Sequence, residues 1–205
     1  MPEPMTTDVL AGHRFRRPVP LSSDGYTADD LFTLPGLPPH TELIDGSLVF
    51  ASPQREFHST MTDLLLVGMR STVPGHLKVV RQMTVVLDRR NGPEPDISVI
   101  RASAVTGPEQ ISFEAADVLL AVEVVSPGSE ARDRDTKPRK YAAAGIEHFW
   151  LVEMTGESRH PVVRVYELDP VTKAYALTGI HHDQLKAGVP YDLGIDITTD
   201  ALTQL

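Results

Sequence analysis

The sequence contains no cysteine among its 205 residues. This absence excludes disulfide bonds, zinc sites built on thiolates and catalysis by a cysteine nucleophile. Proteins that hold no disulfide are common in reducing compartments, and we expect a cytoplasmic location for this one.

Long apolar runs are also missing, because no uncharged stretch approaches the roughly 18 residues that a membrane span needs. The first twenty residues are polar and rich in proline, and they lack the apolar segment of a secretion signal. We therefore expect no contact with a membrane. The composition predicts a flexible N-terminal arm over residues 1–25 and a single globular domain over residues 26–205.

Positive charge is scarce, since 19 lysines and arginines stand against 28 aspartates and glutamates, for a formal net charge of −9. Such a chain repels the phosphate backbone of nucleic acids at long range, which disfavours a simple nucleic-acid-binding protein. An enzyme that first binds a divalent metal ion remains compatible, because the ion makes a carboxylate-rich cleft locally positive.

The apolar residues, 41% of the chain counted with the aromatics, follow patterns typical of alternating helices and strands. Three helices are expected, over residues 27–32, from Glu56 to a position before Pro74, and from Asp133 to Ala144 with Gly145 as its C-terminal glycine. The dipeptide Asp45-Gly46 predicts a hairpin. Further strands are predicted over residues 77–88, 96–100, 118–126, 147–153, 161–168 and 173–180. This order favours the α/β class, with a mixed β-sheet flanked by helices.

One carboxylate, Glu123, lies at the centre of the apolar run LLAVEVV. A buried carboxylate without a partner costs several kcal/mol, so a cation should compensate it. Asp96 opens the preceding strand, and if the two strands are neighbours, both carboxylates can reach one cavity and hold a hard divalent cation. In the alternative interpretation, Asp96 is a turn residue and Glu123 pairs with an arginine such as Arg81.

The next helix carries Lys137 and Tyr141 four residues apart and therefore on one face. A lysine directed at a cluster of metal and carboxylates could orient or deprotonate a water molecule and stabilise a pentacovalent phosphate. The alternative is an ordinary solvated helix turn. His58, at the start of an earlier helix, is expected either to cap or pack there, or to hold a residue of the cavity in place or transfer a proton.

Several blocks of the sequence match a known family in one order: TELIDGSLV, His58, PEPDISVI, LLAVEVVSPGS and ARDRDTKPRKYAAAGIEHFWLVE. With these blocks the chain resembles the putative restriction endonuclease family of the Uma type, a branch of the PD-(D/E)XK nuclease superfamily. The resemblance covers roughly residues 25–195, and the combination of blocks makes it specific.

The resemblance implies a restriction-endonuclease-like core that hydrolyses phosphodiester bonds of nucleic acid, most simply DNA, with Mg²⁺, for which Mn²⁺ can substitute. It also implies that Asp96 and Glu123 bind the metal and act in catalysis, and that Glu42 completes the metal shell. The superfamily lysine usually follows the second acid by two positions, where this chain has Val125. The resemblance therefore assigns the catalytic lysine to Lys137.

Two functions remain open at this point. The first is a Mg²⁺-dependent endonuclease, which the presence of Asp96, Glu123 and Lys137 favours. The second is a catalytically silent binding or scaffold module that retains the fold, which the net charge and Val125 favour. In both cases we expect a homodimer, because residues 148–153 and 173–180 would otherwise leave strand edges and apolar surface uncovered.

Overall fold

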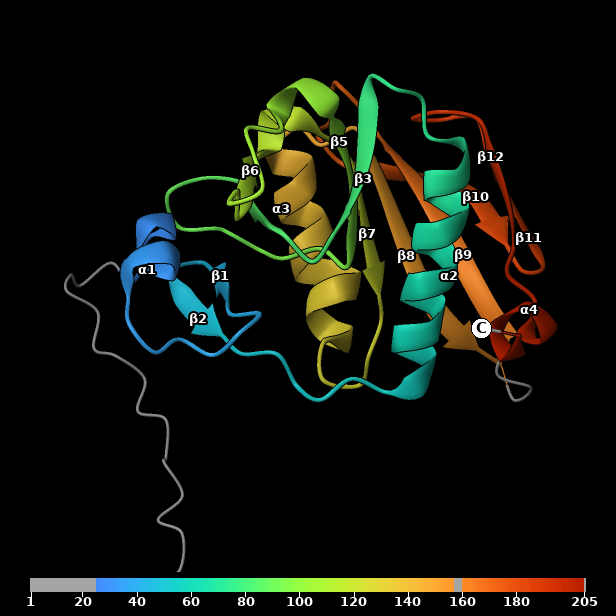
Figure 1. Ribbon diagram of the computed structural model, residues 1–205, viewed down its shortest axis with the longest axis horizontal. Helices are drawn as coiled ribbons and strands as arrows, with labels where there is room; N and C mark the ends of the chain where they lie inside the picture. Colours follow the sequence, from blue (N-terminus) through green and yellow to red (C-terminus); the bar gives the residue numbers. More distant parts are fainter. Residues whose placement is uncertain (1–24, 157–159, 205) are drawn as a thin grey trace, which may run out of the picture.

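The computed structural model describes residues 25–156 and 160–204 (Figure 1), so the predicted arm lies outside the described residues except for Gly25. The helices are α1 (Ala28–Thr33), α2 (Glu56–Thr72), α3 (Lys137–Ala143) and α4 (Thr199–Thr203). The strands are β1 (Glu42–Ile44), β2 (Ser47–Val49), β3 (Leu77–Arg81), β4 (Thr84–Val86), β5 (Ile97–Arg101), β6 (Ser112–Glu114), β7 (Val118–Val124), β8 (His148–Thr155), β9 (His160–Leu168), β10 (Tyr175–His181), β11 (Gln184–Ala187) and β12 (Leu193–Asp196).

A sheet of six strands in the order β10-β9-β8-β7-β5-β3 forms the centre of the molecule. Only the β7–β8 pair is parallel within this sheet, and its other pairs are antiparallel. Helices α2 and α3 lie on opposite sides of the sheet (Figure 1). The predicted α/β class, a mixed sheet flanked by helices, is therefore confirmed. In the described residues, no helix combines the length and the apolar character needed to cross a bilayer.

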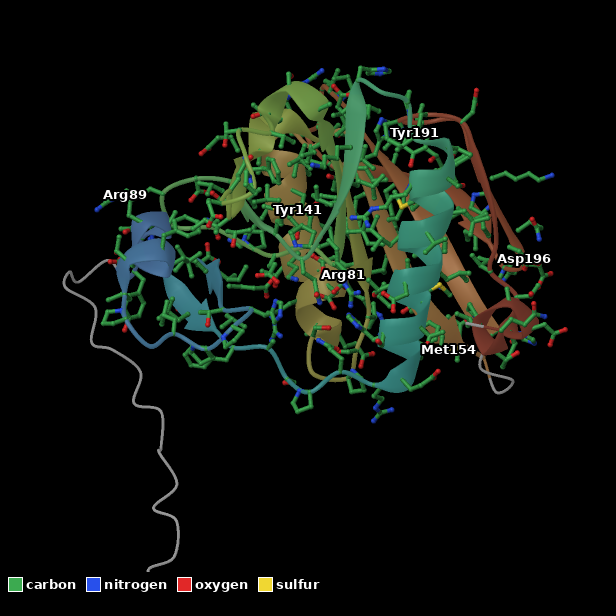
Figure 2. All side chains as sticks on the ribbon, viewed as in Figure 1. Arg81, Arg89, Tyr141, Met154, Tyr191 and Asp196 are labelled. Atoms are coloured by element: carbon green, nitrogen blue, oxygen red, sulfur yellow. The ribbon has the colours of Figure 1, made fainter. Side chains whose placement is uncertain are left out.

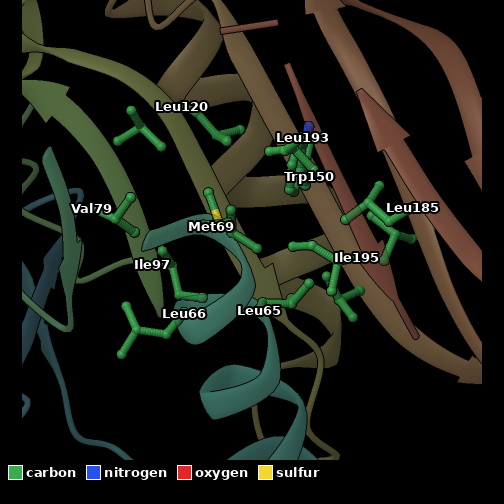
Figure 3. Close-up of a cluster of buried hydrophobic side chains, with 14 of the residues drawn as sticks. Leu65, Leu66, Met69, Val79, Ile97, Leu120, Trp150, Leu185, Leu193 and Ile195 are labelled. Atoms are coloured by element: carbon green, nitrogen blue, oxygen red, sulfur yellow. The ribbon is translucent and has the colours of Figure 1, made fainter. Parts of the chain in front are cut away.

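The alternation of side chains along β7 divides the interior into two cores. Leu120, Val122 and Val124 face α2 and pack with Met69 and Trp150, among others. Figure 3 shows part of this cluster between α2, the sheet and the β11–β12 hairpin. Because both the sheet and α2 contribute apolar side chains here, this face of the sheet is a conventional hydrophobic core.

The other face of the sheet packs against α3. Ala121 and Phe149 contribute to this second core together with Tyr141 of α3. The ring of Phe149 lies 6.0 Å from that of Tyr141, 5.7 Å from that of Tyr166 and 5.5 Å from that of Tyr175, measured between centroids. Glu123 belongs to the same side of β7 as Ala121, so its carboxylate lies between the sheet and α3.

The predicted strand over residues 77–88 is wrong as a single element. It breaks after Arg81 into β3, which stays in the central sheet, and β4, which pairs in parallel with the unpredicted strand β6. At the break Gln82 adopts a φ of 48°, in the left-handed region that residues other than glycine rarely enter. Since neither glycine nor proline marks this position, the sequence pattern contains no signal for the break.

The third predicted helix starts irregularly, because its regular α-helical part begins only at Lys137, as the position of Pro138 favours. A π-helical turn (Arg132–Thr136) precedes α3, and the N–H of Lys137 donates to the carbonyl of Arg132. Pro138 has no N–H to donate, which fits a wider turn just before it. The helix ends at Gly145, whose φ of 85° agrees with the predicted C-terminal glycine.

Candidate active site

Five carboxylates, one of them that of Glu94, and one lysine line a cavity of about 160 Å³ at one end of the sheet. Glu42 comes from β1, Asp96 directly precedes β5, Glu123 lies near the end of β7, Asp133 belongs to the π-helical turn, and Lys137 is the first residue of α3. The antiparallel pairing of β5 with β7 brings Asp96 and Glu123 to the same end of the sheet. All four residues predicted for the site therefore meet in one cavity.

Both carboxylate oxygens of Asp96 are anchored. Oδ1 lies 2.9 Å from Nε2 of His58, and Oδ2 accepts a hydrogen bond of 2.8 Å from the backbone N–H of Val124. His58 is 4% exposed and lies near the start of α2. His58 therefore contacts a carboxylate of the cavity and holds it in place, which was one of the roles considered for it.

The partners of Glu123 are both in α3. Its Oε1 accepts a hydrogen bond of 2.5 Å from the hydroxyl of Tyr141, and its Oε2 lies 3.0 Å from Nζ of Lys137. The predicted placement of Lys137 and Tyr141 on one helix face is thus confirmed. The alternative partner Arg81 is wrong, since its guanidinium binds Asp63 at 2.7 Å.

Lys137 is shared among several carboxylates. Its Nζ lies 2.7 Å from Oε1 of Glu42, 3.0 Å from Oε2 of Glu123 and 3.5 Å from Oδ1 of Asp133. The same oxygen of Glu42 accepts a hydrogen bond of 2.8 Å from the backbone N–H of Glu94. Because Lys137 is only 4% exposed, its charge acts on these carboxylates with little screening by water.

Burial, together with the excess of carboxylates, makes this cluster retain protons. Burial raises the pKa of Glu123 well above its usual value, and that of Asp133 is also raised by burial. Burial alone would lower the pKa of Lys137, but Glu123, Glu42 and Asp133 together raise it well above the usual range. Burial and the neighbouring Glu123 raise the pKa of Tyr141 as well. Lys137 is therefore a cation at neutral pH, and the cluster has room for further positive charge.

Asp133 is a site residue that the sequence interpretation did not single out. It is 1% exposed, and its Oδ1 is buried without a hydrogen-bond partner. A signal for it exists, because Asp133, Lys137 and Tyr141 follow one another at intervals of four residues and thus share a helix face. Tyr141 is labelled in Figure 2, on α3.

The donor set matches a hard divalent cation in chemistry, since carboxylate oxygens from separate elements line the same cavity and Oδ1 of Asp133 accepts no hydrogen bond, with the ammonium of Lys137 3.5 Å away. Within residues 25–156 and 160–204, however, no three histidine, aspartate or glutamate side chains stand in an arrangement that would hold a metal ion. The ammonium of Lys137 lies between Glu42 and Glu123 and pairs with both. Lys137 thus compensates Glu123 in this structure.

Comparison with protein families identifies a model that covers this whole arrangement. Residues 28–199 match the family Uma2, described as putative restriction endonuclease. The chain belongs to this family. The match includes every residue of the cavity named above, and it confirms the resemblance seen in the sequence. Membership of this family supports a nuclease function for the chain.

A solved structure has the same fold. It is described as a putative nuclease belonging to DUF820 from Anabaena variabilis, and the two chains share 19% sequence identity with a TM-score of 0.61. The alignment covers 87% of this chain and 92% of the other. At this identity the likeness shows the fold. A comparison with curated proteins finds no match.

Proposed function

We propose that the protein is an endonuclease that hydrolyses phosphodiester bonds with the help of Mg²⁺. The observation that carries this proposal is the buried Lys137, which lies between Glu42 and Glu123 in the cavity that Asp96 also lines. Negative charge develops on the phosphate during phosphoryl transfer, so the reaction needs positive charge close to the phosphate. The ammonium of Lys137 supplies one such charge, and the carboxylate oxygens can hold a metal ion that supplies more.

Glu42, Asp96 and Glu123 would hold the metal, which when bound lowers the pKa of a water molecule and neutralises charge on the phosphate. The neighbouring carboxylates keep Lys137 protonated, so this residue is not suited to take a proton from water at neutral pH. Its role is to stabilise the pentacovalent phosphate through the charge of the ammonium. The sequence left two roles open for Lys137, to orient or deprotonate a water molecule or to stabilise the phosphate, and we propose the second.

Two buried residues position the carboxylates and have no proposed contact with the substrate. His58 holds Oδ1 of Asp96, and Tyr141 holds Oε1 of Glu123. Fixed carboxylates lose less conformational entropy when a cation binds, and their orientation determines where the cation lies. We expect the replacement of either residue to weaken metal binding clearly, while the melting temperature of the metal-free protein changes little.

The substrate that we propose is DNA, and the proposed assembly is a homodimer. Strand β10 forms an edge of the central sheet, and its Leu177 and Ile180 are each 50% exposed. An exposed edge with apolar side chains favours pairing with a second copy. Light scattering at micromolar concentration should give twice the mass of the chain, and a monomer mass would contradict the dimer.

The function is tested by cleavage assays with single-stranded, double-stranded and branched DNA, and with RNA, in Mg²⁺, Mn²⁺ and EDTA. We expect cleavage that requires the divalent ion and a melting temperature that rises with millimolar metal, since a ligand of the native state stabilises it by mass action. If neither cleavage nor a rise in melting temperature is observed, the protein is a silent module that retains the nuclease fold.

A further inference from the structure

The outer wall of the cavity differs in chemistry from its acidic floor. We define this wall by the exposed and half-exposed residues of two segments, namely Ser52, Gln54, Gly128, Ser129 and Arg132. None of these side chains is acidic, whereas the rest of the cavity lining carries five carboxylates, namely Glu42, Glu94, Asp96, Glu123 and Asp133. With a net charge of −9, the chain repels a polyanion at long range, so a substrate phosphate needs a cation close to the floor.

The two segments of the wall are in close contact. A Cβ atom added to Gly128 would lie 2.8 Å from Oγ and 3.0 Å from Cβ of Ser52, so only glycine fits without a shift. The turn that contains Gly128 continues directly into the helical segment, where the backbone N–H groups of Arg132 and Asp133 both donate to the carbonyl of Ser129, at 2.8 and 2.9 Å. The backbone of Arg132 is thus held at the mouth of the cavity.

The guanidinium of Arg132 has unused hydrogen-bonding capacity. Its Nε is buried and has no hydrogen-bond partner, and no carboxylate in residues 25–156 and 160–204 forms an ion pair with it. Lys137, which lines the same cavity, is fully engaged with Glu42, Glu123 and Asp133. A buried donor without a partner is unfavourable, so an anion that supplies the missing acceptor gains affinity. Arg132 is therefore the arginine of this cavity that remains available to a ligand.

We propose that Arg132 binds a phosphodiester group of the substrate at the mouth of the cavity, an inference that rests on the proposed nuclease function. The planar guanidinium offers two parallel N–H groups to two phosphate oxygens, a geometry that a lysine cannot reproduce. The carboxylate floor then holds the cation, and Arg132 holds the phosphate that the cation acts on. A half-exposed side chain can rotate to bring its free donors to the anion.

The test compares Arg132→Ala and Arg132→Lys with Arg139→Ala as a matched control. The side chain of Arg139 is 75% exposed, pairs with Asp135 on its own helix and does not line the cavity. Binding of a short fluorescent DNA duplex is measured by anisotropy in Ca²⁺, a hard cation used here in place of Mg²⁺, over a series of salt concentrations. Melting temperatures are measured first, and Arg132→Ala should melt no lower than the parent, because it removes an unsatisfied donor.

We expect Arg132→Ala to bind about tenfold more weakly and to lower the slope of log K against log salt by about 0.9, the value for one lost phosphate contact. Arg132→Lys should recover the slope, because it keeps the charge, but only part of the affinity. Arg139→Ala should match the parent. In Mg²⁺, Arg132→Ala should raise KM more than it lowers kcat.

Three results would overturn the proposal, and they separate it from the nuclease function. If the parent cleaves DNA and Arg132→Ala binds with the parent's affinity and slope, Arg132 has no phosphate contact and the nuclease function stands. If Arg139→Ala loses as much affinity as Arg132→Ala, the effect is one of general charge. If the parent neither binds nor cleaves DNA or RNA, both proposals are wrong.

Discussion

Two buried carboxylates on neighbouring strands of the central sheet have opposite surroundings. Glu123 of β7 and Glu153 of β8 are 2% and 5% exposed, and each binds a cation from the helical segment 132–143. The ammonium of Lys137, which pairs with Glu123, also pairs with Glu42 and Asp133. Glu153, in contrast, accepts hydrogen bonds of 2.9 and 2.6 Å from Nε and Nη2 of Arg134 and also pairs with Arg164.

The contrast separates a structural ion pair from a functional one. Glu153 pairs with two arginines, so no further cation is required to stabilise it. Around Glu123 the carboxylates exceed the cations, and the raised pKa values of Glu123 and Asp133 follow from burial without enough compensation. Such an excess is unfavourable for the fold alone, and it suits a site that binds a cation during function.

The removal of Lys137 should lower the stability of the protein more than any other substitution proposed here. Lys137→Met leaves Glu42, Glu123 and Asp133 buried without their shared cation, and breaking a buried pair in this way costs about 3–5 kcal/mol. At 2–4 °C per kcal/mol, the melting temperature should fall by roughly 6–20 °C. Calorimetry at pH 8 and pH 5 measures the change. The loss should be smaller at pH 5, where the carboxylates take up protons more readily.

Millimolar metal should restore part of the stability of Lys137→Met, because it replaces the lost positive charge, while cleavage stays abolished. Lys140→Met is the matched control, since the ammonium of Lys140 pairs with the exposed Asp45 outside the carboxylate cluster. A melting temperature of Lys137→Met within about 2 °C of the parent would show that the carboxylates do not depend on this lysine.

A smaller loss of stability is expected from Glu153→Gln. The amide keeps one acceptor but removes the charge that faces Arg134 and Arg164, which should cost about 1.5–3 kcal/mol. The ion pairs of Glu153 hold the helical segment that carries Asp133 and Lys137, so Glu153→Gln should shift these two side chains slightly. The rate of cleavage should therefore fall only slightly. Thermal melting with a cleavage assay checks both effects. Glu130→Gln, at an exposed partner of Arg134, should change stability by less than about 1 kcal/mol.

The opposite behaviour is expected at Glu123. Glu123→Gln can still accept the hydrogen bond of Tyr141, and it relieves the repulsion with the other carboxylates of the cavity. The variant should therefore melt no lower than the parent without metal, yet lose cleavage and the metal-induced rise in melting temperature. A metal-free variant that melts several degrees lower would place Glu123 with Glu153, as a structural ion pair.

The sequence predicted the elements that local patterns control. The period of two along β7 separates Glu123 from the apolar face of the strand, and the spacing of Lys137 and Tyr141 places both on one helix face, which in the structure meets Glu123. Other features depend on tertiary register. Arg164 reaches Glu153 because β9 pairs with β8 so that Arg164 stands opposite Leu151. That pairing is set by the whole sheet, and no short-range pattern encodes it.

The missed features have similar causes. Asp133 enters the cavity through a π-helical turn, which adds a residue to the helix and has no reliable sequence signature beyond the following Pro138. The break between β3 and β4 occurs at Gln82, whose left-handed backbone is stabilised by its surroundings, including the hydrogen bond from its N–H to the carbonyl of Asp96 at 3.2 Å. Both irregularities lie at the cavity, where strain is expected to serve function.

The smallest effect is expected at His148, which carries an unsatisfied polar group outside the cavity and can therefore be compared with Glu123. His148 begins β8, at the other end of the strand from Glu153, and its Nδ1 is buried without a hydrogen-bond partner. Burial lowers its pKa below the usual 6.5, which the nearby Glu167 and Glu147 only partly oppose. The unfolded state thus binds a proton more readily than the folded state, and stability is complete above pH 6.5 and is lost as the pH falls through the folded pKa.

His148→Gln should remove this loss, so that its melting temperature changes less than that of the parent between pH 7 and pH 5. The difference should be about 1 kcal/mol or less, or roughly 2–4 °C. Cleavage at neutral pH should not change, because His148 does not line the cavity. If His148→Gln instead loses cleavage, an unsatisfied buried group outside the cavity also matters for function. The excess of carboxylates around Glu123 would then no longer distinguish the site from the rest of the fold.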